Sequence, residues 1–146
     1  MGAVDNFIHL FAPLTANCRD FRAKWDESKG LSPEGISGCW TGEWISKATG
    51  HHGRLLCVIS PLAPALWRMY FRAEYATLFR ACYSTDVTLY QKEDGWTFTG
   101  GSDLGVLAGG EYSYAGRATL ESLLCSYKSS RDHGEFRLRR ETSRNL

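Results

Sequence analysis

Alternation of apolar and polar residues, running from about residue 40 to residue 138, is the feature that most constrains this chain. Stretch 66–75 shows it most clearly, because its odd-numbered residues are apolar or aromatic and its charged residues stand between them. Successive side chains of a β-strand point to opposite faces, so a period of two predicts strands with one buried face. No long helical pattern interrupts the strands after residue 35. The chain is therefore predicted to be mainly β.

Turn signals divide the alternating region into eight candidate strands. Pro61 and Pro64 are expected to end the second strand, and the Gly-rich hairpin turns at 92–95 and 132–134 separate later ones. Consecutive hairpins favour an antiparallel meander, and eight strands suffice to close a small barrel without exposed edges. We predict an eight-stranded antiparallel up-and-down β-barrel over residues 36–141. The competing fold is an α+β cone, in which N-terminal helices fill the concave face of an open sheet.

A short helical segment is expected to precede the barrel, within a single domain that spans residues 1–146. Residues 5–11 predict one short helix, and residues 15–29 predict a second that ends at Gly30. An amphipathic helix of this kind packs on an apolar surface, either across one barrel end, against the barrel wall, or in a homodimer. The apolar stripe consists of Leu14, Cys18, Phe21 and Trp25.

Composition excludes several classes of protein. The 146 residues suit one domain, and the net charge of +1 gives no basis for binding nucleic acid. No apolar run is long enough for a membrane helix, and the first residues do not form a secretory signal. Five cysteines, an odd number without a C-x-x-C pair, predict reduced, partly buried thiols and a cytoplasmic location.

The start of the barrel region resembles the calycin group, the lipocalins and fatty-acid-binding proteins. It contains Gly38-Cys39-Trp40, which is the Gly-x-Trp pattern that opens the first lipocalin strand, and a second copy at Gly42-Glu43-Trp44. The lipocalin pattern also has a late arginine over that tryptophan, and three arginines on the last strand are candidates here. The Arg-x-Tyr pair of fatty-acid-binding proteins is missing. The resemblance implies a barrel fold and the binding of a small ligand. The candidate arginines are Arg137, Arg139 and Arg140.

The inward faces of the predicted strands are rich in aromatic residues. An aromatic cavity would suit a small hydrophobic or aromatic ligand. Small residues at 42, 73, 81 and 116 are expected to leave room for it. The alternative is a filled core in a structural or interaction module. The candidate ligand-binding residues are Trp40, Trp44, Trp67, Phe71, Tyr83, Trp96, Tyr112 and Tyr114.

One rim of the barrel offers a second candidate site. In an up-and-down barrel of eight strands, the hairpins that carry His51, His52 and His133 lie at the same end, with Asp103 and Asp132 near them. Imidazoles with carboxylates suit zinc or another divalent metal, or proton transfer in an enzyme. The sequence does not decide whether the protein is an enzyme. It requires no cofactor, although zinc at the rim or haem in the interior would be compatible with it.

Overall fold

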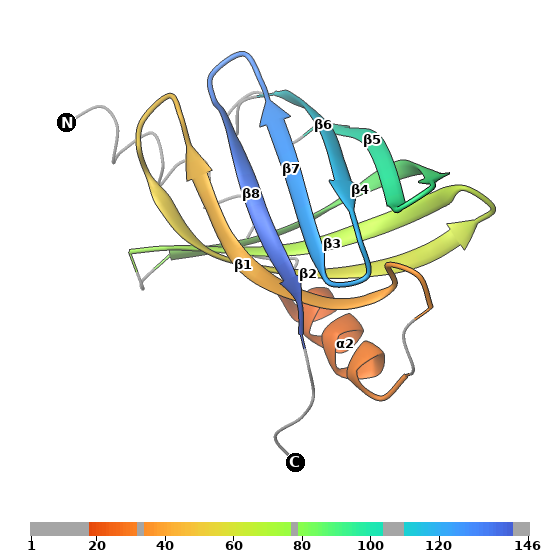
Figure 1. Cartoon of the computed structure of the whole chain (residues 1–146). Coiled ribbons are helices and arrows are strands. Elements are labelled where there is room, and N and C mark those ends of the chain that lie inside the picture. Colours follow the sequence, from red (N-terminus) through yellow and green to blue (C-terminus); the bar gives the residue numbers. More distant parts are fainter. Residues whose placement is uncertain (1–17, 32–33, 77–78, 104–109, 142–146) are drawn as a thin grey trace.

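The described part of the chain forms a closed antiparallel β-barrel with a helix outside it. The computed structural model describes residues 18–31, 34–76, 79–103 and 110–141. The strand order is β1-β2-β3-β4-β5-β6-β7-β8, closed by pairing of β8 with β1 (Figure 1). The elements are α2 (Cys18–Lys29), β1 (Gly38–Ser46), β2 (His52–Ala63), β3 (Leu66–Tyr75), β4 (Phe79–Lys92), β5 (Gly95–Asp103), β6 (Glu111–Ala118), β7 (Ser122–Lys128) and β8 (His133–Arg140).

Closure confirms the up-and-down barrel that the alternation predicts. The pairing of β1 with β8 runs from Trp40 opposite Arg140 to Ser46 opposite Gly134. The open α+β cone is therefore wrong, because no sheet edge is left between these two strands. The short helix expected at 5–11, and the part of the second helix before Cys18, lie outside the described residues.

Strand parity divides the apolar residues between two cores. On β3 the odd-numbered residues from Trp67 to Tyr75 face the barrel interior, as the alternation predicts. Corresponding positions on the other strands join them in one buried cluster that fills much of the barrel. A smaller cluster lies on the outer face of the wall, where strand residues of the opposite parity meet the helix.

Strand β2 continues through Pro61, although the sequence predicts that it ends there. The last residue of β2 that pairs with β1 is Ile59, opposite Gly38, whereas Pro61 pairs only with Trp67 on β3. Proline has no N–H to donate, and it is tolerated where a strand has a partner on one side only. The register shifts between Pro61 and Ala63, as expected for a bulge at such a position.

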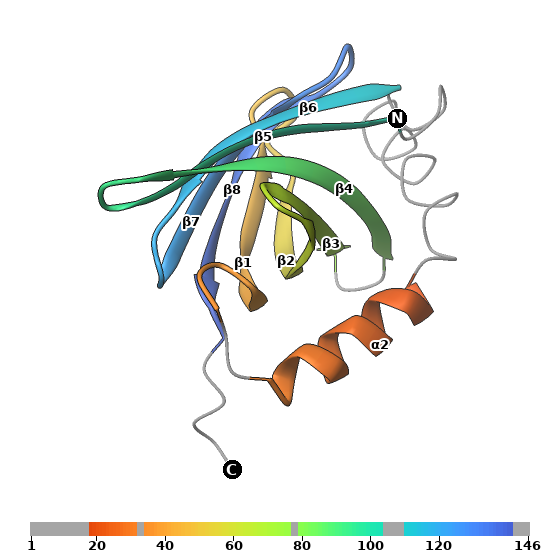
Figure 2. The same cartoon turned by 90° about the vertical axis from the view of Figure 1, so that its right-hand side faces the viewer.

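Helix α2 lies against the outer wall of the barrel rather than across an end (Figure 2). Its buried residue Phe21 joins Leu56 and Val58 of β2, and Trp25 packs against the same cluster. These strand residues face outward, and the helix shields them from water. In the described ranges no helix is long and apolar enough to span a membrane.

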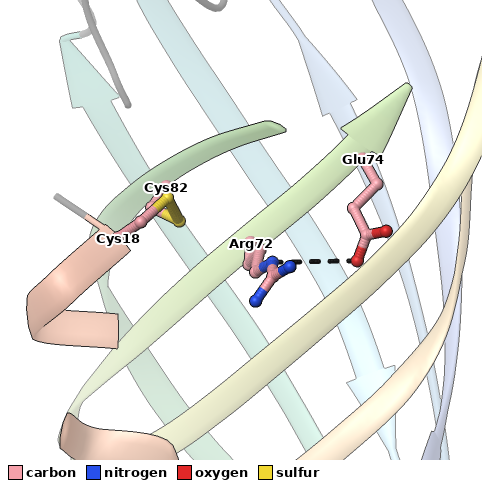
Figure 3. The surroundings of a disulfide bond; sticks show 4 residues. All are labelled: Cys18, Arg72, Glu74 and Cys82. Atoms are coloured by element: carbon pink, nitrogen blue, oxygen red, sulfur yellow. Dashed lines mark ion pairs between the residues drawn. A yellow bond between two sulfur atoms is a disulfide. The ribbon is translucent and has the colours of Figure 1, made fainter. Parts of the chain in front are cut away.

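A disulfide joins Cys18, at the start of α2, to Cys82 on β4 (Figure 3). The prediction of reduced cysteines is therefore wrong for this pair, and it holds for the buried thiols Cys39, Cys57 and Cys125. The two bonded cysteines are 64 residues apart in sequence. Only the packing of α2 on the wall brings them together, so their spacing carries no signal of the bond.

Candidate functional site

One end of the barrel is closed by Arg140, the last residue of β8. Its guanidinium carbon lies 4.6 Å from the centre of the Trp40 ring. Its N–H groups donate hydrogen bonds to the carbonyl oxygens of Gly35 at 2.6 Å and Ser37 at 2.7 Å, and also to that of Leu120. Of the three candidate arginines, Arg140 is the one that covers the tryptophan. We call this the closed end.

The segment before β1 completes this closure. Ile36 is fully buried in the interior cluster, and its carbonyl accepts a hydrogen bond from Nε1 of Trp40 at 3.0 Å. Gly35 lies beside the ring of Trp96. Trp40 and Trp96 therefore contribute to the seal at this end, in addition to any role in contacting a ligand.

Two of the small residues expected to leave room in the interior do not do so. A Cβ atom added at Gly42 would lie 1.8 Å from the carbonyl oxygen of Arg137, so the backbone of β8 occupies that place. At Gly116 it would lie 2.4 Å from the ring of Phe98. These glycines allow close packing, and any space for a ligand lies elsewhere in the barrel.

The opposite half of the interior is lined by aromatic rings packed face to face and edge to face. Phe71 is 5.2 Å from Tyr83, 6.4 Å from Tyr114 and 5.3 Å from Phe136, measured between ring centres. Tyr112 continues the series at 6.4 Å from Tyr114. Such separations are typical of attractive aromatic pairs. We call this half, toward the β1–β2 and β7–β8 hairpins, the tyrosine end.

The phenols of the tyrosine end are held in their neutral, hydrogen-donating form. Burial raises the pKa of Tyr83 well above its usual value, with Tyr114 contributing. Burial also raises the pKa of Tyr112 and of Tyr127. Phenols in an apolar interior can therefore serve as hydrogen-bond donors to a ligand at any physiological pH.

Burial also makes the two interior thiols, Cys57 and Cys125, unreactive. Burial raises the pKa of Cys125 to about 12, and it raises that of Cys57 well above its usual value. A thiol acts as a nucleophile or a metal ligand through its thiolate. Neither cysteine is therefore a candidate catalytic group.

A polar network lies at the rim of the tyrosine end. The Ser46 hydroxyl donates to Oδ1 of Asp132 at 2.5 Å, and the Tyr127 hydroxyl lies 3.4 Å from Oδ2. Tyr127 is also 3.4 Å from the carbonyl oxygen of Ile45. The network ties the β7–β8 hairpin to the end of β1. It places one carboxylate directly above the aromatic interior.

The three rim histidines do not come together as a metal site. His51 packs on Tyr75 with ring centres 5.0 Å apart, and His52 is exposed on β2. His51 and His52 line an open pocket of about 590 Å³ that His133 does not line. Among the described residues no group of three His, Cys, Asp or Glu side chains could hold a metal ion. His51 packs on Tyr75 of β3, so its ring is directed toward β3 rather than toward β8, which carries His133.

All eight of the predicted ligand-binding residues belong to the interior cluster or pack against it. The structure thus places them on one inner surface, and their contact with a ligand stays a prediction. The set predicted from sequence omits Tyr75, Tyr127 and Phe136. Their positions in the alternation of their strands would have placed them on the inner face. Asp132 lies at the predicted rim, and its hydrogen bonds there join it to Ser46 and Tyr127 rather than to a histidine.

Comparison with known proteins supports the fold and goes no further. No protein-family model and no curated protein matches the sequence. The crystal structure of Rv2717c from M. tuberculosis superposes with a TM-score of 0.55 at 13% identity, covering 78% of this chain and 96% of that one. A de novo designed fluorescence-activating β-barrel gives 0.51 at 16% identity, covering 80% and 98%. A point mutant of the fluorescent protein UnaG gives 0.41 at 11% identity, covering 74% and 97%.

The calycin-like architecture is thus supported by several independent features. The barrel is closed and eight-stranded, and Arg140 covers the tryptophan of Gly38-x-Trp40 as the lipocalin pattern implies. The match to the first two solved structures extends over almost their whole length. At identities this low the likeness shows the fold alone, and function has to be argued from the site.

Proposed function

We propose that the tyrosine end of the barrel binds a small, flat aromatic or hydrophobic ligand. The observation that carries this proposal is the gathering of tyrosine hydroxyls on one largely apolar inner surface. A core that only fills space is built from aliphatic and phenyl groups, because each buried hydroxyl requires a polar partner. Several donors set among stacked rings instead suit a ring system that carries hydrogen-bond acceptors. The phenols come from Tyr83 on β4 and from Tyr112 and Tyr114 on β6, whereas the hydroxyl of Tyr127 on β7 already contacts Asp132.

The charge of the inner surface supports a ligand that places no charged group at the middle of the barrel. At the described inward positions of the eight strands the only charged residue is Arg140, and it is occupied at the closed end. A charged group at the middle of the barrel would have to be desolvated without an opposite charge, which is costly. The designed fluorescence-activating barrel offers a precedent for function within this architecture.

The rival proposals have weaker support. A metal-dependent or acid–base enzyme at the rim would require the histidines to form a group, which they do not do in the described part of the chain. A homodimer through the N-terminal helix is disfavoured because the apolar face of α2 covers the barrel's own wall. A cytoplasmic location stays a prediction from sequence, and the Cys18–Cys82 disulfide weighs against it because disulfides are rare in reducing compartments.

Titration with neutral aromatic probes tests the proposal. Acridine at pH 8 and N-phenyl-1-naphthylamine are expected to bind saturably and to compete with each other, as followed by probe fluorescence. Tyr83→Phe removes one inward hydroxyl and should weaken acridine about two- to tenfold, the size of one neutral hydrogen bond. Tyr90→Phe is the matched control, because Tyr90 is 54% exposed on the outer face.

Absence of saturable binding for both probes would overturn the proposal. If Tyr90→Phe weakens binding as much as Tyr83→Phe does, the probe binds on the outside of the barrel. That result would also count against the interior site. Circular dichroism of each variant checks that the barrel is intact.

A further inference from the structure

We propose that Asp132 selects ligands with a positively charged group, so that the protein binds a planar aromatic cation with its charge at the tyrosine end. This inference rests on the proposed function and specifies the class of its ligand. It assigns Asp132 the role of a specificity-determining residue at the mouth of the barrel.

The position of the carboxylate is defined from two sides. Its Oδ1 accepts a hydrogen bond from Ser46, which is 1% exposed, and its Oδ2 lies 3.4 Å from the hydroxyl of Tyr127. Ser46 and Tyr127 both point inward, from β1 and β7. The carboxylate therefore lies over the interior, and it is held in one orientation by groups on two different hairpins.

The negative charge of Asp132 has no cationic partner within salt-bridge distance among the described residues. Its two hydrogen-bond donors are neutral. The Ser46 hydroxyl does not ionise, and the pKa of Tyr127 is raised by burial and by the carboxylate itself. Nearby Lys47 pairs instead with Glu135 on the outer face at 3.5 Å. Arg131, the preceding residue in the chain, is exposed. Neutral donors orient a carboxylate and leave its charge uncompensated, which favours a cation in the adjacent space.

The rings below the carboxylate strengthen this preference. Tyr127 is 6.3 Å from Tyr112 and 6.4 Å from Phe136, between ring centres. The faces of aromatic rings carry negative potential and attract cations, most strongly where water is excluded. A carboxylate above a wall of rings is thus complementary to a flat cation, which would stack on the rings and direct its charge to Asp132.

A matched pair of probes tests the inference. Acridine is neutral at pH 8 and 10-methylacridinium is a permanent cation on the same ring system. The wild-type protein should bind the cation more tightly. Asp132→Asn, which keeps the shape and the hydrogen-bonding oxygen, should weaken the cation about tenfold, as expected for loss of one charge-assisted contact, and leave acridine nearly unchanged.

Glu135→Gln is the control, since it removes the same charge from the outer face of the same hairpin. It should leave both affinities as they are. Equal binding of the two probes by the wild type, or an equal effect of Asp132→Asn on both, would overturn the inference while the aromatic site stands. If neither probe binds, the proposed function fails as well. If Glu135→Gln weakens the cation as much as Asp132→Asn, the effect comes from overall charge, and the inference fails.

Discussion

At the scale of single residues, Arg140 combines several roles at one end of the barrel. It holds three backbone carbonyls from two separate segments and covers a fully buried tryptophan. Burial lowers its pKa, although a guanidinium remains protonated in proteins. The closed end of the barrel therefore depends on one planar, multidentate group that neither lysine nor an apolar residue can replace.

Replacing this residue should cost stability without altering the tyrosine end. Arg140→Met leaves the carbonyls of Gly35 and Ser37 without their donor, so we expect a loss of about 2–4 kcal/mol in the free energy of unfolding. Arg139→Met, on the outward face of the same strand, should change it by less than about 0.5 kcal/mol. Urea denaturation measures both variants. Equal losses would show that Arg140 does not seal the barrel.

At the scale of elements, closure of the sheet depends on how closely β8 approaches β1. Gly42 lies in β1 opposite Leu138, and a Cβ atom there would collide with the backbone of Arg137. A clash between a methyl group and backbone atoms cannot be relieved by a rotamer change. Glycine is thus required at this point for the two strands to pair.

Gly42→Ala is therefore expected to destabilise the barrel by about 3 kcal/mol, through overpacking at the β1–β8 seam. Gly30→Ala serves as the control, because the nearest atom to its added Cβ is the carbonyl oxygen of Glu27 at 3.7 Å. Thermal and urea unfolding of the two variants make the comparison. A Gly42→Ala protein as stable as the Gly30→Ala protein would contradict the close approach.

The attachment of α2 to the wall gives a second prediction at this scale. The Cys18–Cys82 bond spans 64 residues of sequence. Cross-links of this span stabilise proteins by about 2–4 kcal/mol, mainly through the unfolded state. Reduction with dithiothreitol should lower the stability of the wild type by that amount and leave Cys18→Ser unaffected. A wild type that is insensitive to the reductant would argue against the bond.

At the scale of the whole molecule, burial in the barrel interior and under α2 keeps several weak acids protonated. Burial raises the pKa of Cys39 to about 11 and that of Cys125 to about 12, from an ordinary value of 9.0. Cys57, Tyr83 and Tyr127 shift in the same direction for the same cause. The unfolded chain releases these protons at lower pH than the barrel does.

Stability should therefore fall in alkaline solution. The contribution of each such group is fully present below the pKa of the unfolded chain, and it is lost as pH rises through the pKa in the fold. For Cys39 this window runs from about 9 to about 11, with a slope of about 1.4 kcal/mol per pH unit. Cys39→Ser should show a correspondingly shallower decline in urea titrations. A free energy of unfolding that stays constant from pH 8 to 11 would contradict the burial of these groups.

The sequence by itself determined which residues face inward and how many strands there are, because the alternation of side chains is a local property of extended backbone. It therefore predicted the barrel and the aromatic interior, and the resemblance to lipocalins implied a late arginine over Trp40. The choice of Arg140 among three candidates depended on the register of β8 against β1, which local pattern does not encode.

Only the tertiary structure decided which distant segments meet. The Cys18–Cys82 bond follows from the packing of α2 on the wall, and the Ser46–Asp132–Tyr127 network follows from closure, which brings the first and last hairpins together. The tertiary structure also kept the rim histidines of the described residues from forming a metal site, since His51 packs on Tyr75 of β3 and His133 does not line the pocket that His51 and His52 share. Contacts between residues far apart in sequence depend on register and strand tilt, and these arise from the packing of the whole barrel.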